Sequence, residues 1–201
     1  MLLPMWVQAQ GDLTDGKTIG GSENARFRLT LLAGFNASQI DGDDLAGFNK
    51  VGVNVGGQVN ILLDRTDWVG RFQPSVGIGF TQLGSSPGNQ DDGIYRAQRF
   101  RMAYAQIPVM INYIDQRWMF STGFAYGRLV NSSFIDSNDL DVTDTIAGNY
   151  RDGDVNFIGG FTYYVTQNIG VNIQWEHSTY SINKIGRQVH RLITFRVAYT
   201  F

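Results

Sequence analysis

Three adjacent residues, Glu176, His177 and Ser178, are the residue types of a hydrolase triad, in which an acid orients an imidazole that deprotonates a hydroxyl. They lie in the stretch IGVNIQWEHS, where apolar and polar residues alternate as in a β-strand. Successive side chains of a strand point to opposite faces, which separates His177 from the other two. We therefore expect His177 beside Trp175 at a surface, and we predict no catalytic residues and no enzymatic activity.

Carboxylates are the other residues that could support chemistry. The stretch DGDD, residues 41–44, offers the oxygen ligands that calcium prefers, but it lacks the spacing and the closing Glu of an EF-hand loop. Residues 136–154 carry six Asp, as is typical of a solvated loop, although they could also bind cations or a partner. The absence of Cys from the sequence excludes a disulfide scaffold and a thiolate zinc site. We predict neither a metal site nor a cofactor.

The elements that position these residues are predicted to be strands. Eight stretches of the 201-residue chain alternate between apolar and polar residues over about ten positions. The 16 Lys and Arg nearly balance the 18 Asp and Glu, which gives no electrostatic argument for nucleic acid binding. The sequence has no uninterrupted run of about 18 apolar residues, so it predicts no membrane-spanning helix.

The connections between the stretches alternate strictly between short and long. LDRTD, DQR and TQN are the size of hairpin turns. The segments 39–50, 84–98, 131–153 and 181–190 are long and rich in Gly, Asp, Asn and Ser. This pattern predicts an all-β domain over residues 26–201, an eight-stranded antiparallel up-and-down β-barrel with its tight turns at one end.

The apolar face of the strands is expected to point outward. The opposite face carries Gly, Ser, Thr, Asn, Gln and Arg, with Glu176 as almost its only carboxylate, which is unlike a surface that meets water. Small and polar residues suit a narrow lumen, and Val, Ile, Phe and Trp suit lipid. Strands of about ten residues match an outer membrane, and aromatic residues near both strand ends predict two interfacial belts. The alternative is a soluble β-sandwich with the same aromatic residues in its core.

Arginines occupy several positions on the polar face. Because buried cations need partners, we predict that they form a network with Glu176, Tyr and Asn side chains that plugs the lumen, with Arg196 paired to Glu176. In the fourth stretch the alternation slips by one residue after Tyr104, and Pro108 beside the slip suggests a β-bulge. The predicted lumen network consists of Arg28, Arg71, Arg99, Arg101, Glu176 and Arg196. Near the long-loop rim, Arg128 and Arg191 are placed to contact lipopolysaccharide phosphates, or serve as solubilising charges.

The stretch from Ala33 to Gly57, AGFNASQIDGDDLAGFNKVGVNVGG, resembles the first hairpin of the PorT family of outer-membrane β-barrels of Bacteroidota. The shared positions are Gly34, Asn36, Ser38, Gln39, Gly42, Asp43, Gly47, Lys50 and Gly52. QIPVMINY also resembles the fourth strand of that family, and the likeness extends from about Arg26 over nearly the whole chain. It implies an outer-membrane barrel with both termini in the periplasm.

The resemblance also implies a function. The member that gives the family its name belongs to the type IX secretion and gliding system, whereas many paralogues have no assigned role. We expect a structural or accessory subunit of an envelope secretion or outer-membrane assembly complex, with other outer-membrane or periplasmic proteins and lipopolysaccharide as partners. The alternatives are a lipid A-modifying outer-membrane enzyme and a small-solute porin.

The two chain ends carry further predictions. Val7 and Ala9 precede Gln10 in a pattern that signal peptidase accepts, so residues 1–9 are predicted to be a signal-peptide remnant and residues 10–25 a periplasmic extension outside the fold. At the other end, outer-membrane barrels resemble one another in a last strand that the barrel-assembly machinery engages, with apolar residues at alternate positions. The residues that fit this assembly signal are Ile193, Phe195, Val197, Tyr199 and Phe201.

Overall fold

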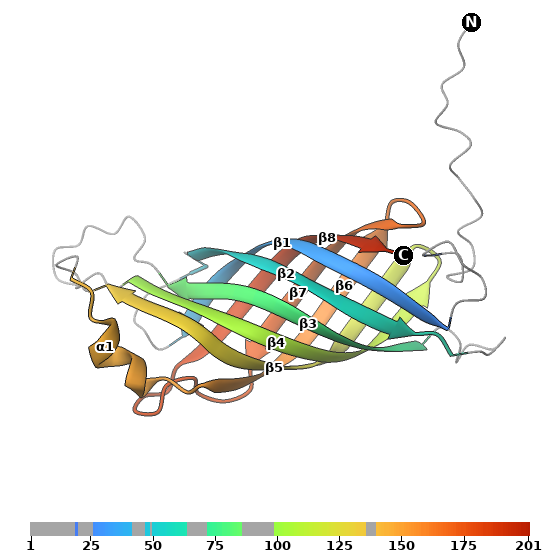
Figure 1. The fold of residues 1–201 in the computed structure, drawn as a ribbon. Coiled ribbons are helices and arrows are strands. Elements are labelled where there is room, and N and C mark those ends of the chain that lie inside the picture. Colours follow the sequence, from blue (N-terminus) through green and yellow to red (C-terminus); the bar gives the residue numbers. More distant parts are fainter. Residues whose placement is uncertain are drawn as a thin grey trace, which may run out of the picture.

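A computed structural model describes residue 19 and residues 26–41, 47–48, 50–63, 72–85, 99–135 and 140–201. Eight antiparallel strands in these ranges form a closed barrel, in which each strand pairs with its neighbours in the chain (Figure 1). The strands are β1 (Phe27–Asp41), β2 (Lys50–Ile61), β3 (Phe72–Ser85), β4 (Arg99–Asp115), β5 (Trp118–Ile135), β6 (Gly153–Tyr164), β7 (Ile169–Ser178) and β8 (Val189–Thr200). The predicted eight-stranded up-and-down barrel is confirmed.

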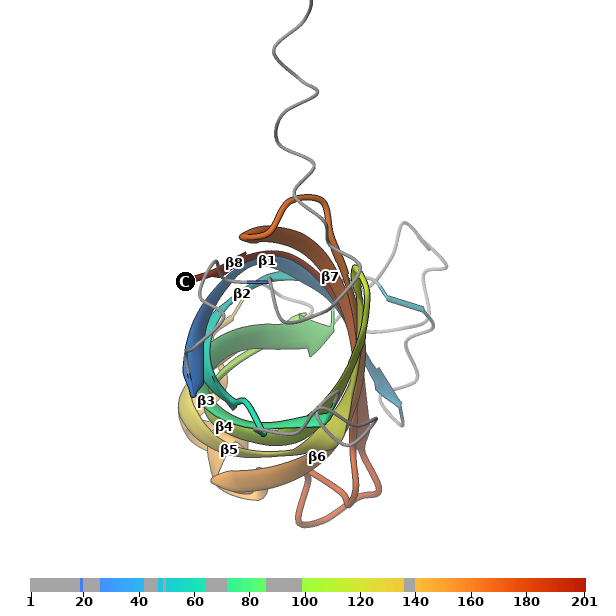
Figure 2. The same cartoon turned by 90° about the vertical axis from the view of Figure 1, so that its right-hand side faces the viewer.

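The last strand closes the barrel against the first. In the β1–β8 register Phe35 lies opposite Phe195, and the Phe201 backbone N–H donates a 2.9 Å hydrogen bond to the Leu29 carbonyl. Figure 2, which looks along the barrel, shows the strands as a complete ring. Closure satisfies the backbone groups that would otherwise form two free edges, which is what a sheet in lipid requires.

The side chains alternate between an apolar outer face and a polar lumen. In β2 the valines are exposed, with Val51 at 70%, whereas Asn54, Gln58 and Asn60 are buried. A soluble sandwich would bury the valines instead. Burying amides while leaving valines in contact with the surroundings is stable only when those surroundings are apolar, so the arrangement favours a lipid environment.

Aromatic side chains gather near both ends of the barrel. At the tight-turn end Trp118 stacks on Phe161, with ring centroids 5.0 Å apart, and contacts Tyr163 at 4.5 Å. Toward the long-loop end Phe157 meets Trp175, whose ring stacks on His177. These positions agree with the two predicted interfacial belts.

The connections differ between the two ends, as Figure 1 shows. Two residues, Gln116 and Arg117, turn the chain from β4 into β5, and Gln116 has a positive φ of 52°. The connection from β5 to β6 at the opposite end contains α1 (Thr143–Ile146) and the short 3₁₀ helix η3 (Ala147–Asn149). No helix within the described ranges has both the length and the apolar character needed to cross a membrane.

An apolar cluster lies near each end of the lumen. At the tight-turn end Ile114, Met119 and Tyr164 pack around Ile19, which is 1% exposed. The sequence predicted that Ile19 lies outside the fold, with the rest of residues 10–25. In the structure its side chain packs against the apolar cluster at the tight-turn end of the barrel. The cluster at the long-loop end comprises Ile40, Leu83, Phe100, Met102, Tyr104, Phe134, Tyr150, Ile182 and Leu192.

The outer part of β4 differs from the sequence prediction. Phe100, Met102 and Tyr104 are buried in the lumen, and the alternation of β4 continues without a slip. The register shift lies between β4 and β5, where Ala103 pairs with Asn131 and Tyr104 with Leu129, so that β5 carries the extra residue. Arg99 and Arg101 are exposed on the outer face. The prediction that they line the lumen was therefore wrong, because this end of the barrel buries apolar side chains as a soluble protein does.

Candidate functional site

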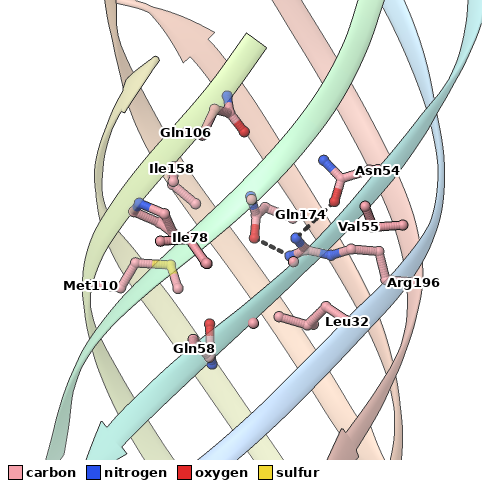
Figure 3. Close-up of a pocket in the computed structure, with 14 residues that line it drawn as sticks. Leu32, Asn54, Val55, Gln58, Ile78, Gln106, Met110, Ile158, Gln174 and Arg196 are labelled. Carbon is pink, nitrogen blue, oxygen red and sulfur yellow. Dashed lines mark hydrogen bonds between the residues drawn. The ribbon is translucent and has the colours of Figure 1, made fainter. Parts of the chain in front are cut away.

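The centre of the lumen is organised by Arg196 of β8. Its Nε and Nη2 donate to Asn172 Oδ1 at 2.9 and 2.7 Å, and its Nη1 donates to Asn54 Oδ1 at 3.1 Å. Nη2 also donates to Gln174 Oε1. Figure 3 shows the guanidinium reaching from β8 toward Asn54 and Gln174. The inward position predicted for Arg196 is thus observed, with amide oxygens as its direct partners.

Glu176 of β7 is the buried carboxylate of the same layer, with 0% exposure. It accepts hydrogen bonds from Gln174 Nε2 at 2.7 Å and from Gln106 Nε2 at 3.1 Å. Gln174 therefore connects Arg196 to Glu176, and the direct Arg196–Glu176 pair expected from the sequence is replaced by this bridge. Gln106 lies on β4, so the chain of hydrogen bonds crosses the lumen. One buried cation and one buried anion in a single network limit the cost of taking both charges out of water.

A second polar layer lies between this network and the tight-turn end. Asn112 Nδ2 donates to Ser75 Oγ at 2.9 Å and to Asn60 Oδ1 at 3.2 Å. Asn60 Nδ2 in turn donates to Thr30 Oγ1 at 3.0 Å. Arg28, two residues before Thr30 on β1, is 2% exposed, in agreement with its predicted place in the lumen. Arg71, the remaining member of the predicted network, lies outside the described residues.

A small cavity lies beside the Arg196 layer (Figure 3). The volume open to the centre of a water molecule is about 20 Å³, and Gln106, Met110, Ile158 and Gln174 are among the residues around it. This is room for about one water molecule. At this level the hydrogen bonds from Arg196 through Gln174 and Glu176 to Gln106 lie across the lumen.

A third polar group lies below the apolar cluster at the long-loop end. His190 Nδ1 is 3.3 Å from Asp154 Oδ2, and the His190 backbone N–H donates to Ser178 Oγ at 3.0 Å. All three residues are at most 1% exposed. Sequence reasoning missed this group, although each residue lies at a lumen-facing position of its strand. Serine, histidine and aspartate are the types of a catalytic triad, but the serine oxygen contacts backbone and the group is sealed from substrate.

The neighbouring residues of β7 behave as predicted. Glu176 and Ser178 are buried in the lumen, whereas His177 points to the outer face. The His177 ring lies parallel to the Trp175 ring, with an interplanar angle of 11° and centroids 5.7 Å apart. Glu176, His177 and Ser178 therefore do not form a catalytic unit.

The outer rim carries Arg128 and Arg191, both exposed. Arg191 Nη2 forms a 2.9 Å ion pair with Asp41 Oδ2. Asp41 is the only described residue of the DGDD stretch. Within the part of the chain that the structure describes, no group of three or more His, Asp or Glu side chains is arranged to hold a metal ion.

Four residues of the predicted assembly signal line the outer face of β8, and the fifth, Phe201, follows this strand directly. Phe195, Val197, Tyr199 and Phe201 are exposed, and Ile193 is partly exposed. Tyr199 and Phe201 contact each other edge to face, with centroids 4.8 Å apart. Recognition of this strand by the assembly machinery stays a prediction.

Comparison with known proteins supports the membrane assignment. Residues 8–185 match a family model described as "Outer membrane protein beta-barrel domain". The chain is similar in fold to Ail, the attachment invasion locus protein of Yersinia pestis, whose structure was solved with the heparin analogue sucrose octasulfate; the TM-score is 0.51 at 11% identity over 88% of this chain and 100% of Ail. Neisserial surface protein A gives a TM-score of 0.50 at 10% identity over 88% of this chain and 98% of that protein. No curated protein matches the sequence significantly.

Proposed function

This chain belongs to the family of outer membrane protein beta-barrel domains, and from that premise we propose that it acts as a non-enzymatic structural or accessory subunit of an envelope complex. The complex serves protein secretion, as in type IX secretion and gliding, or outer-membrane assembly. In this proposal both termini face the periplasm and the long connections face outward. The barrel works by binding partners and does not conduct solutes.

The side chains that lie across the lumen are the observation that carries this proposal. The Arg196 network crosses the centre, and apolar clusters lie at both ends. The central network holds a buried cation and a buried carboxylate, and a solute that passed this level would have to break their hydrogen bonds. A barrel whose lumen is crossed in this way offers only its surface and its connections for function.

The long-loop end supports a role in binding. The apolar cluster there packs against Val142, Ile146 and Ala147 of the β5–β6 connection. The cluster thus holds part of that connection in a defined position. Leu140 and Ile185 are 61% and 78% exposed on two different connections at this end. Exposed apolar side chains held on a rigid support are suited to contact another protein.

Purification of the barrel from native membranes in a mild detergent, with identification of the copurifying proteins, tests the proposal. We expect stoichiometric partners from a secretion or assembly apparatus. The matched control is the Leu140→Ser/Ile185→Ser variant, which should lose partners while keeping the heat-modifiable mobility of a folded barrel. A barrel that copurifies with no envelope protein under these conditions would contradict the proposal.

Two further measurements distinguish the other classes of function. Mass spectrometry of lipid A from cells with and without the gene should show the same species, and a change in acylation or phosphorylation would indicate an enzyme. Reconstitution in planar bilayers should show no large stable conductance, whereas a porin would conduct.

A further inference from the structure

Two tyrosines meet at Gly153 on the outer wall of the barrel, where β6 begins between β5 and the end of β7. Tyr126 of β5 lies against this glycine, since a Cβ atom there would be only 3.0 Å from the Tyr126 hydroxyl oxygen. The hydroxyl of Tyr180, which follows β7, donates a 3.4 Å hydrogen bond to the Gly153 carbonyl. Both tyrosines are exposed, at 52% and 39%. A residue without a side chain at position 153 thus allows both phenol groups to lie close to the backbone.

Two exposed arginines lie beside these tyrosines. Arg128 of β5 pairs in register with the same glycine. Arg151 lies two residues before the glycine, with its guanidinium carbon 5.8 Å from the centroid of the Tyr180 ring. The Leu129 backbone N–H donates to the Asp152 carbonyl at 2.7 Å, so the segment that carries Arg151 still runs beside β5. By strand geometry the two arginines are diagonal neighbours, with Cα atoms about 7–8 Å apart.

The depth of this group in the membrane follows from β5. Its outward side chains run from Trp118 in the tight-turn belt through Phe120 and Phe124 to Tyr126 and Arg128. The step from residue 118 to residue 128 spans about 33 Å of strand, which the usual tilt of a barrel strand reduces to about 25 Å of height. The apolar band of an outer-membrane barrel has this height. Arg128 therefore lies where the hydrocarbon of the bilayer meets the lipid head groups.

The chemistry of the four side chains suits a phosphate. Guanidinium groups bind phosphate oxygens through paired N–H donors, and phenol hydroxyls are further donors. Asp152 lies next to Arg151 in the chain, so two arginines and one aspartate leave one net positive charge. Arg191, the other arginine for which the sequence predicted a phosphate contact, already forms an ion pair with Asp41. The group around Gly153 is thus the better placed of the two to bind an anion.

We propose that Tyr126, Arg128, Arg151 and Tyr180 bind the phosphate group of a phosphorylated glycolipid of the outer leaflet. A phosphate monoester on a sugar carries more negative charge than the diester of a phospholipid, so it suits a pair of arginines better. The exposed tyrosine rings provide apolar surface for the sugar that carries the phosphate. The inference rests on the proposed function for its orientation, in which the long connections face outward.

The test uses the full chain in phosphatidylcholine nanodiscs with increasing amounts of lipid A, and native mass spectrometry counts the lipid A molecules that stay bound. The probes are phosphorylated lipid A and the same lipid after removal of its phosphates. Arg128→Gln/Arg151→Gln should raise the amount of phosphorylated lipid A needed for half-saturation by about tenfold, because charge-assisted hydrogen bonds are lost. The dephosphorylated lipid should bind more weakly to the unmodified chain, and the double substitution should not change its binding.

Arg187→Gln/Arg191→Gln is the matched control, since it removes two cations from exposed positions at the same end of the barrel. This control should bind phosphorylated lipid A like the unmodified chain, and heat-modifiable mobility verifies that each variant is folded. Equal losses in the two double variants, or no loss in the first, would overturn the proposal. Release of bound lipid A by millimolar inorganic phosphate would also overturn it, because that result indicates a site for a free anion.

The outcome is independent of the partner test of the proposed function. Arg128→Gln/Arg151→Gln leaves Leu140 and Ile185 in place, so the copurifying proteins should be the same as for the unmodified chain. Loss of lipid A with unchanged protein partners supports the lipid site, and retention of lipid A contradicts the site without affecting the partner proposal.

Discussion

Replacing Arg196 with methionine tests whether the central network stabilises the barrel. Methionine keeps an unbranched chain of similar length but donates no hydrogen bond. The substitution leaves the oxygens of Asn54, Asn172 and Gln174 without the donor they have in the structure. It also leaves Glu176 as a buried anion without the cation to which Gln174 connects it.

The size of the effect follows from these contacts. Each buried acceptor that loses its donor costs about 1–3 kcal/mol, and removal of one partner from a buried charge pair costs about 3–5 kcal/mol. The cavity beside Arg196 has room for about one water molecule, which can satisfy one or two of the freed oxygens. With one freed oxygen left unsatisfied and one charge left unpaired, we expect the free energy of unfolding to fall by about 4–8 kcal/mol, a large part of the total for a domain of this size.

Urea titration of the barrel in phospholipid vesicles measures this free energy, with tryptophan fluorescence and heat-modifiable mobility as independent readouts. Arg191→Met is the control, since Arg191 is half exposed and its ion pair with Asp41 should contribute less than about 1 kcal/mol. In Arg196→Met/Glu176→Gln both buried charges are absent, so its loss should be smaller than the sum of the single losses. A loss below about 1 kcal/mol for Arg196→Met, or additive losses in the double variant, would refute the reasoning.

Three further predictions concern the lumen and the chain ends. Ile19→Asp places a carboxylate among Ile114, Met119 and Tyr164, so it should weaken protection of these residues in hydrogen exchange while the strands remain paired; unchanged protection would show that Ile19 contributes little. Phe201→Asp removes the aromatic residue that follows β8 and should reduce the amount of folded barrel in cells, and normal heat-modifiable folding would count against an assembly role. Tyr104→Ala/Phe134→Ala empties part of the outer apolar cluster and should lower the free energy of unfolding by about 3 kcal/mol or more, measured by urea titration, and a neutral result would mean that the cluster is not packed.

The closed barrel could be predicted from the sequence because its signals are local. A strand such as β2 shows its two faces in a period of two residues, and the alternation of short and long connections specifies neighbouring strands. The inward positions of Arg28, Glu176 and Arg196 follow from the same period. Alternation identifies the face of a residue but not its partners in other strands, which is why the bridge through Gln174 was not foreseen.

The outer part of β4 could not be predicted by the same rule. The prediction assumed that apolar side chains point outward along the full length of every strand. Phe100, Met102 and Tyr104 instead point into the lumen, because the outer end of the barrel has an apolar core of its own, as a soluble protein does. The Asp154–His190 contact was missed for a different reason: it joins two strands that are not adjacent in the barrel, and only the three-dimensional closure brings them together.

The burial of Ile19 has a consequence for the order in which the molecule is completed. Its site consists of Ile114, Met119 and Tyr164, which belong to β4, β5 and β6. The contacts of Ile19 therefore depend on strands that lie about 95 to 145 residues later in the sequence. Ile19 can take its place only after these three strands have come together. Burial of Ile19 therefore indicates that β4, β5 and β6 have paired. A time-resolved probe at this position should show a late kinetic phase, separate from the pairing of the first strands.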